Sequence, residues 1–181
     1  YKLAHGNVVR DILLNSWEGV YFDINQKGMD QMMSDIASMG GELFVMDDGW
    51  FGDKYPRKND SSSLGDWVTD KNKLPEGIEG LIRDAKKHGI KFGIWIEPEM
   101  ANTISELYEK HPEWILKAPQ RDPVLGRGGT QVVLDLANPE VQVFVFKVVD
   151  DLMTQYPDIA YIKWDANMAI MNHGSNYLAA D

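Results

Sequence analysis

Two alternating patterns of apolar residues run through this chain. Short, nearly continuous apolar runs predict buried strands, and longer segments in which apolar residues recur every three or four positions predict amphipathic helices. The short runs give four expected strands, at 11–17, 43–46, 90–97 and 159–165. The longer segments give four expected helices, from Asn25 to Gly40, from Gly77 to His88, from Thr103 to His111 and from Asn138 to Pro157.

Capping signals support three of the helix boundaries. Asn25 and Asn138 are expected to be N-cap residues, because an Asn side chain accepts a hydrogen bond from the first free backbone N–H groups of a helix. Pro139 stands at the first helical position after Asn138, where proline is favoured. Thr103, with Glu106 three residues later, forms the pattern of a capping box.

The order of the elements predicts the fold class. Strands that alternate with helices predict a parallel α/β sheet built from right-handed crossovers. Four such units fit half of a (β/α)8 barrel, because a whole TIM barrel needs eight strands and about 250 residues. An open, doubly wound sheet is the alternative, but no glycine-rich phosphate turn follows the first strand. Residues 1–181 are therefore expected to form one domain, the amino-terminal half of a barrel.

Three of the four expected strands carry acidic residues at their carboxyl ends. They are Asp47 and Asp48 at the second strand, Glu97 and Glu99 at the third, and Asp165 at the fourth. In a barrel of parallel strands, the carboxyl ends of the strands form the active face. The sequence therefore predicts that these carboxylates meet at one face of the molecule.

The last expected strand ends on charged residues. Alternate side chains of a strand share a face, so Tyr161, Lys163 and Asp165 are expected on one face. Ile162 and Trp164 are expected on the other. The Lys163 ammonium would then lie beside the Asp165 carboxylate and lower its pKa, which makes Asp165 a candidate nucleophile. An ion pair that only caps the strand is the alternative.

Two segments lack a periodic pattern. Residues 49–75 are rich in Ser, Asp, Lys and Gly and contain an isolated Trp67, so they predict a long functional loop, with a surface insertion as the alternative. Residues 113–137 contain a glycine-rich stretch around Arg127. They are expected to form a loop with a short extended or helical segment.

Composition narrows the range of partners. With 44% hydrophobic and 25% charged residues, the 181-residue chain is expected to be a soluble globular domain. Its formal net charge of −10 argues against nucleic acid and anionic membranes and favours a neutral substrate. Cysteine is absent and the four histidines show no ligand spacing, so no metal site is expected. No signal peptide and no apolar run of about 18 residues is found, and the compartment stays open.

Six short blocks of the sequence form a pattern that is more specific as a set than any one block alone. They are 15–18 (NSWE), 47–52 (DDGWFG), 92–100 (FGIWIEPEM), 111–114 (HPEW), 133–136 (VLDL) and 163–167 (KWDAN). In this order, over nearly the whole chain, they resemble the α-galactosidases of glycoside hydrolase family 36. The resemblance implies a catalytic (β/α)8 barrel and a retaining enzyme without a cofactor. Such an enzyme hydrolyses terminal α-linked galactose, in sugars of the melibiose and raffinose type, through a covalent intermediate.

The resemblance also implies roles for individual residues. Asp165 would be the nucleophile, and Lys163 would keep it ionised and bind sugar hydroxyls. Asp47 and Asp48 would accept hydrogen bonds from the galactose 4- and 6-hydroxyls, and Trp95 would pack against the sugar ring. From the residues alone, Asp47 or Asp48 could instead cap the loop after their strand, and Trp95 could be barrel core.

Three further positions match the family less closely. Arg127 resembles its sugar-contacting arginine but lies two residues farther from Gln131 than in the family's pattern. Asn167 and Trp17 are weaker candidates for sugar contact. The two glutamates after the third strand are expected to support a polar network rather than to act in catalysis.

A second catalytic carboxyl group is not expected in this chain. Retention requires an acid/base about 5–5.5 Å from the nucleophile. In the family this residue is an Asp several dozen positions downstream, beyond Asp181. The β-rich domains that flank the family's barrel are absent as well, so the chain is expected to be a fragment. An open half barrel exposes sheet edges, and self-association is therefore expected.

Other functions stay open. The chain could be a non-catalytic sugar-binding or assembly module. Within the family, it could instead belong to a galactosyltransferring raffinose-oligosaccharide synthase or to an α-N-acetylgalactosaminidase.

Overall fold

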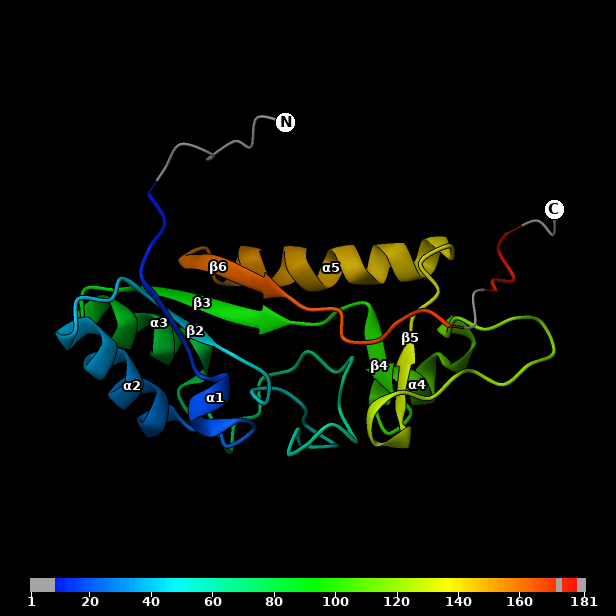
Figure 1. Ribbon diagram of the computed structural model, residues 1–181, viewed down its shortest axis with the longest axis horizontal. Coiled ribbons are helices and arrows are strands. Elements are labelled where there is room, and N and C mark those ends of the chain that lie inside the picture. The colour runs from blue at the N-terminus through cyan, green and yellow to red at the C-terminus, as the bar shows by residue number, and fades with distance from the viewer. Residues whose placement is uncertain (1–8, 172–173, 179–181) are drawn as a thin grey trace.

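The structure, a computed structural model, describes residues 9–171 and 174–178. Its larger sheet has four parallel strands and occupies one half of the molecule (Figure 1). The strand order is β1–β2–β3–β6. The strands are β1 (Leu13–Asn15), β2 (Leu43–Met46), β3 (Lys91–Ile96) and β6 (Ile159–Trp164). The four predicted strands and their parallel arrangement are confirmed, although the first strand is shorter than 11–17.

Three longer helices pack on one face of this sheet. They are α2 (Gln26–Ser38), α3 (Gly77–Lys87) and α5 (Pro139–Gln155). Met33, Leu81 and Leu152 of these helices share one core with Phe44 and Ile94 of the strands. The helices expected in these regions are therefore confirmed, and their apolar stripes are the faces that meet the sheet.

A second, smaller sheet follows β3. It pairs β4 (Met100–Asn102) with β5 (Gln131–Val133) in antiparallel fashion. The same region contains α4 (Glu106–Lys110) and the 3₁₀ turns η1 (Pro112–Trp114) and η2 (Arg127–Gly129). Helix α5 runs past both sheets, because Val141 and Val145 pack in the core of the small sheet and Leu152 packs in that of the large one (Figure 1).

The helix caps agree with prediction at two of three positions. The caps at Asn25 and Asn138 are confirmed, since each side chain accepts a backbone hydrogen bond from the first turn of its helix. The cap at Thr103 is wrong. The N-cap of α4 is Ser105, whose Oγ accepts the Tyr108 amide at 3.0 Å. Thr103 instead donates its amide to the Thr130 carbonyl at 2.7 Å and lies in the bend between β4 and α4.

A short helix that was not predicted, α1 (Trp17–Val20), follows β1. The sequence pattern assigned Trp17 to the first strand. Asn15 Oδ1 accepts a hydrogen bond from the Trp17 amide at 2.8 Å. This local side-chain bond competes with the strand and turns the chain into a helix.

The register of the large sheet sets which side chains meet on the face away from the helices. Gly93 pairs with Val45 on one side and with Tyr161 on the other. The next residue of β3 on that face is Trp95, which pairs with Lys163. Strands β1 and β6 are the edges, and the described part of the chain contains no strand that closes the sheet.

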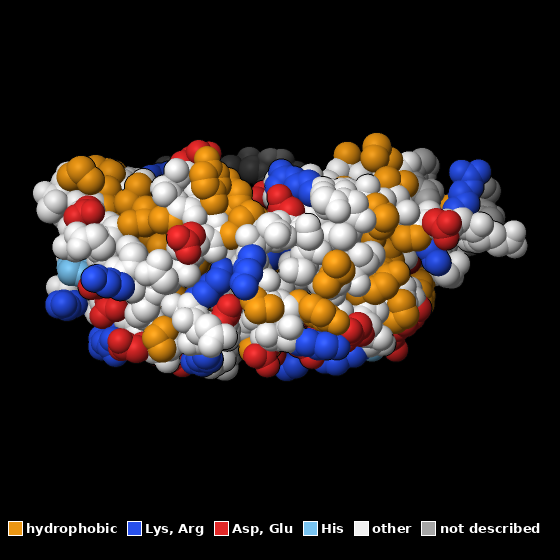
Figure 2. Space-filling view, turned by 90° about the horizontal axis from the view of Figure 1, so that it is seen from below, with side chains coloured by type: hydrophobic (Ala, Val, Ile, Leu, Met, Phe, Trp, Pro, Cys, Tyr) orange, Lys and Arg blue, Asp and Glu red, His pale blue; other side chains and the backbone are white. Residues whose placement is uncertain are grey.

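Charged side chains of both signs share the surface. On the face shown in Figure 2, Lys and Arg side chains lie among Asp and Glu side chains and do not gather in one basic patch. This face therefore offers no extended positive surface to a nucleic-acid backbone. None of the described helices is both long and apolar enough to span a bilayer.

We expect Gly93→Ala to destabilise the sheet. A Cβ at Gly93 would lie 3.0 Å from Tyr161 Cβ and 3.1 Å from Val45 Cγ2. Overpacking between two strands costs about 1–3 kcal/mol, which chemical denaturation would measure. Gly19→Ala is the control, because a Cβ there meets only the flexible end of Met32. Equal losses in the two variants would contradict this explanation.

Candidate active site

A small cavity of about 90 Å³ lies at the carboxyl edge of the large sheet. Every residue that the sequence predicted as a catalytic or sugar-binding group lines it. The lining residues are Trp17, Asp47, Asp48, Asp60, Trp95, Glu97, Arg127, Lys163, Asp165 and Asn167. These residues lie far apart in the sequence, so the parallel strands and the loops after them bring them together.

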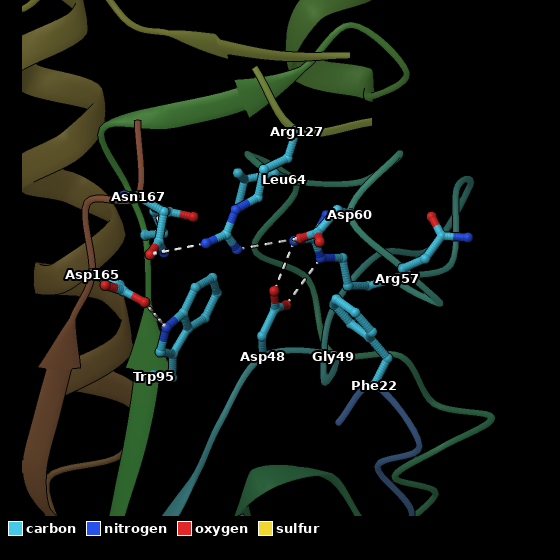
Figure 3. A network of polar contacts seen from close by, with 12 residues as sticks. Phe22, Asp48, Gly49, Arg57, Asp60, Leu64, Trp95, Arg127, Asp165 and Asn167 are labelled. Atoms are coloured by element: carbon cyan, nitrogen blue, oxygen red, sulfur yellow. Dashed lines mark hydrogen bonds and ion pairs between the residues drawn. The ribbon is translucent and has the colours of Figure 1, made fainter. Parts of the chain in front are cut away.

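Asp165 directly follows β6 and lies beside Trp95 (Figure 3). Its Oδ2 accepts a hydrogen bond from Trp95 Nε1 at 3.1 Å, and its Oδ1 accepts the Ala166 amide at 3.1 Å. Burial acts to raise the pKa of Asp165, but hydrogen bonds from Asn167 and these two donors, with the charge of Lys163, together lower it. The carboxylate is thus ionised at neutral pH, the state that a nucleophile requires.

Lys163 pairs with a different carboxylate from the one predicted. Its Nζ lies 2.7 Å from Asp47 Oδ2, and Asp47 is its ion-pair partner among the described residues. The Lys163 side chain reaches across β3 to the residue that follows β2. Asp47 is almost fully buried, so the attraction between the two charges is strong there. The Lys163 charge also lowers the pKa of Asp165, but less than the hydrogen bonds to that carboxylate do.

Both carboxylate oxygens of Asp47 have partners. Oδ2 accepts Asn15 Nδ2 at 2.6 Å as well as Lys163 Nζ. Oδ1 accepts the Asp48 amide at 2.9 Å, and the Asp47 amide donates to Ser16 Oγ at 2.9 Å. Asp47 therefore caps the turn after β2, as the alternative interpretation of this residue expected. It also lines the cavity, where the sugar-binding interpretation requires it.

Arg57 is a partner of Asp48 that the sequence analysis missed. Its Nε donates to Asp48 Oδ1 at 2.9 Å and its Nη2 donates to Oδ2 at 2.7 Å (Figure 3). Arg57 is fully buried, with its guanidinium 5.2 Å from the Phe22 ring and 5.7 Å from the Phe51 ring. Burial raises the pKa of Asp48 in spite of this pair. An arginine in the aperiodic stretch 49–75 carries no pattern that marks it as buried.

Arg127, Asn167 and Asp60 form the more exposed rim of the cavity, and the contacts that Arg127 makes there are long. Arg127 Nη2 donates to Asn167 Oδ1 at 3.5 Å, and Arg127 Nη1 lies 3.9 Å from Asp60 Oδ1 (Figure 3). Asp60 also lies 3.5 Å from Arg57. The glycine-rich turn η2 thus brings Arg127 to the cavity, as predicted, whereas Asp60 was not predicted. Half of the Arg127 side chain is exposed, so these contacts hold the rim weakly.

Glu97 is the most buried carboxylate of the cavity. Its Oε1 accepts the Asn167 amide at 2.6 Å and Asn167 Nδ2 at 2.9 Å. Burial raises the pKa of Glu97 to about 7, against the effect of the two Asn167 bonds. Glu97 therefore orients Asn167, in line with the polar-network role expected for it. Glu99 is not part of the cavity lining and accepts Trp164 Nε1 at 2.7 Å.

Trp95 belongs to the core and to the cavity. Only 2% of it is exposed, and its ring stacks on Phe51 with centroids 6.2 Å apart, as the core alternative expected. Trp95 Nε1 donates a hydrogen bond to Asp165, which lines the cavity. Trp67 packs on Trp95 at 6.1 Å, and both Phe51 and Trp67 come from residues 49–75. This loop is therefore part of the core rather than a surface insertion.

The chemistry of the site is that of oxygen acceptors and N–H donors. Carboxylates, an ammonium, a guanidinium and amides surround a small space, a set of groups that binds hydroxyls. No cluster of three or more His, Asp or Glu side chains arranged to hold a metal ion occurs within residues 9–171 and 174–178. The arrangement can bind a polyhydroxylated ligand beside one ionised carboxylate.

Comparison with known proteins identifies the family. The family model described as melibiase matches residues 2–181. The chain belongs to this family. Among the relatives of this melibiase-family chain, probable alpha-galactosidase C of Aspergillus oryzae is 45% identical over 168 residues, which are 89% of this chain and 22% of that protein. Alpha-galactosidase AgaA of Geobacillus stearothermophilus is 41% identical over 169 residues, which are 93% of this chain and 22% of that protein.

Solved structures agree with this assignment. The crystal structure of the GH36 alpha-galactosidase AgaA from Geobacillus stearothermophilus has a TM-score of 0.89 at 39% identity, over 97% of this chain and 24% of that one. An AgaA variant in complex with raffinose has a TM-score of 0.88 at 39% identity, with the same coverage. The resemblance to glycoside hydrolase family 36 is thus confirmed. This melibiase-family chain spans 22% to 24% of the length of these relatives.

We expect Glu97→Gln to change how stability depends on pH. The pKa of Glu97, about 7, lies above its ordinary value of 4.5, so the fold favours the protonated form. This contribution to stability is complete below pH 4.5 and is lost as the pH rises through 7. Glutamine keeps the oxygen that accepts the Asn167 bonds and does not titrate.

The variant should therefore match the wild type near pH 4.5 and exceed its free energy of unfolding by about 2–3 kcal/mol at pH 8. Chemical denaturation at the two pH values measures the difference. Glu99→Gln, at a carboxylate away from the cavity, is the matched control. A Glu97→Gln variant that is equally destabilised at both pH values would refute the assignment.

Proposed function

We propose that this chain is the amino-terminal half of the catalytic (β/α)8 barrel of a retaining α-galactosidase, with Asp165 as the nucleophile. The observation that carries the proposal is the ionised Asp165 carboxylate at the end of β6, in one cavity with Asp47, Asp48 and Lys163. Four parallel strands with helices on one face correspond to half of an eight-stranded barrel. The α-galactosidase relatives, one of them crystallised with raffinose, support melibiose- and raffinose-type sugars as the substrate class.

The reaction proposed is a double displacement. An Asp165 oxygen forms a bond to the anomeric carbon of galactose while the bond from that carbon to the leaving oxygen breaks. A carboxylic acid gives the leaving oxygen its proton. Water then loses a proton to the same residue and attacks the anomeric carbon, which releases galactose and restores the Asp165 carboxylate. None of these steps requires a cofactor.

We assign the acid/base to a residue outside these 181 positions. The other aspartates of the cavity are engaged by cations. Asp48 pairs with Arg57 and Asp47 pairs with Lys163. Asp60 lies near both Arg57 and Arg127. Glu97 titrates in a suitable range, but only 1% of it is exposed and it is bonded to Asn167. A group that exchanges a proton with a leaving sugar needs access to that sugar, which these contacts deny.

The remaining cavity residues are assigned to the sugar. Acceptors and donors that are already held in place bind hydroxyl groups best, because their side chains then lose little conformational entropy on binding. Arg57 and Lys163 fix the aspartates after β2 in this way. The proposed sugar contacts are Asp47 and Asp48 for the 4- and 6-hydroxyls, Trp95 for the ring, and Lys163, Arg127 and Asn167 for further hydroxyls.

Self-association is proposed for this chain on its own. The edge strand β6 exposes Tyr161 and Trp164, at 45% and 46%, and α5 exposes Val143 and Phe146, at 65% and 69%. An unpaired edge beside apolar side chains favours pairing with another copy. Light scattering should give a mass above that of the monomer, and a monodisperse folded monomer would contradict the proposal.

We expect Asp165→Asn to abolish turnover of an aryl α-galactoside by the natural polypeptide that carries this chain, because an amide is a poor nucleophile. The fall in kcat should reach about 10⁴-fold or more, with the unfolding transition little changed. Mass spectrometry of the wild type treated with a slow-reacting galactosyl donor should find the adduct on Asp165.

Asp158→Asn, at an exposed position bonded to Lys86, is the matched control. Retained activity in Asp165→Asn would refute the nucleophile assignment. Turnover by residues 1–181 alone would place an acid/base among them, against the proposed mechanism. Binding of galactose without turnover or adduct in any form of the protein would favour a non-catalytic sugar-binding module.

A further inference from the structure

Lys73 joins three backbone segments beside the candidate site. Its Nζ donates hydrogen bonds to the carbonyl oxygens of Phe22 at 2.8 Å, of Gly49 at 2.7 Å and of Arg57 at 2.7 Å. An ammonium group has three N–H donors, so the main chain uses all of them. Burial lowers the pKa of Lys73. A desolvated ammonium needs hydrogen-bond acceptors, and the three carbonyls supply them.

Each of the three segments is linked to Asp48, either directly or through Arg57. Gly49 follows Asp48 in the chain, and Arg57 holds the Asp48 carboxylate through two hydrogen bonds. The Phe22 ring lies 5.2 Å from the Arg57 guanidinium (Figure 3). A closed circuit of contacts therefore runs from Lys73 through Gly49 and Asp48 to Arg57 and back to Lys73.

The backbone at Gly49 passes close to that of Phe22. Gly49 has φ of +115°, and a Cβ there would lie 3.0 Å from Phe22 Cα. Carbonyl oxygens that converge on one point repel each other unless a positive charge lies between them. The Lys73 ammonium supplies that charge, so it fixes the path of the chain on both sides of Asp48.

We propose that Lys73 is a positioning residue that holds the Asp48 carboxylate in place for a hydroxyl of the sugar, without contacting the sugar itself. Lys73 is absent from the cavity lining. The inference rests on the proposed assignment of Asp48 to a galactose hydroxyl. A small displacement of Asp48 weakens one hydrogen bond and leaves Asp165 untouched, so Lys73 governs discrimination between sugars rather than the chemical step.

The test measures kcat/KM of the natural polypeptide for an aryl α-galactoside and for its 4-deoxy and 6-deoxy analogues. Asp48→Asn first identifies the hydroxyl whose discrimination depends on Asp48. Lys73→Met should lower that same discrimination by about tenfold. It should change kcat for the deoxy analogue little, because that substrate makes no bond to Asp48.

A double-mutant cycle separates positioning from general damage. Adding Lys73→Met to Asp48→Asn should lower the discrimination no further if Lys73 acts through Asp48. A structural defect would instead lower kcat/KM for all three substrates alike. Lys71→Met, at an exposed lysine of the same loop, is the matched control and should leave the discrimination at the wild-type value.

Lys73→Arg keeps the positive charge but replaces three diverging donors by a planar group. It should therefore lower the discrimination as well, and it decides the question if Lys73→Met does not fold. Wild-type discrimination in the folded Lys73 variants would overturn the inference. Absence of any α-galactosidase activity in the wild type would instead overturn the proposed function, so the two failures are distinguishable.

Discussion

The parallel register of the large sheet is the constraint on which the rest of the structure depends. Because the four strands run in one direction, the residue after each strand arrives at the same edge. This brings Asp47, Glu97 and Asp165 together from three distant parts of the chain. The helices cover one face of this sheet, so every second side chain of a strand points to the opposite face, where the site lies. A slip by one residue in β6 would turn Lys163 and Asp165 to the helical face.

Several carboxylates lie close together in the site, and they differ in their ion-pair partners and in the direction of their pKa shifts. Asp47 pairs with the half-buried Lys163, and Asp48 pairs with the fully buried Arg57. Burial raises the pKa values of Asp48 and Glu97, whereas hydrogen-bond donors lower that of Asp165. Like charges in one small space would otherwise repel each other. The differences in environment give neighbouring carboxylates separate tasks, with Asp165 ionised and free of an ion pair among the described residues.

The loop of residues 49–75 contributes side chains to the buried core, as a helix or strand usually does. Its Phe51 and Trp67 pack in the aromatic cluster around Trp95, and Arg57 is fully buried beneath the site. A buried loop must provide partners for its backbone carbonyls. Lys73 donates to two of them, those of Gly49 and Arg57. Polar contacts, rather than periodic apolar packing, therefore determine the conformation of this region.

The sequence by itself determined the elements of the large sheet, their parallel direction, the family, and most of the residues that line the cavity, Asp60 excepted. These follow from local periodicity and from blocks of neighbouring residues, which are visible without contacts. Only the tertiary structure decided that Lys163 pairs with Asp47, that Arg57 holds Asp48, and that Lys73 joins three segments. The physical reason is that a charged side chain pairs with the group that lies nearest to it in space. Segments far apart in the sequence determine which group that is.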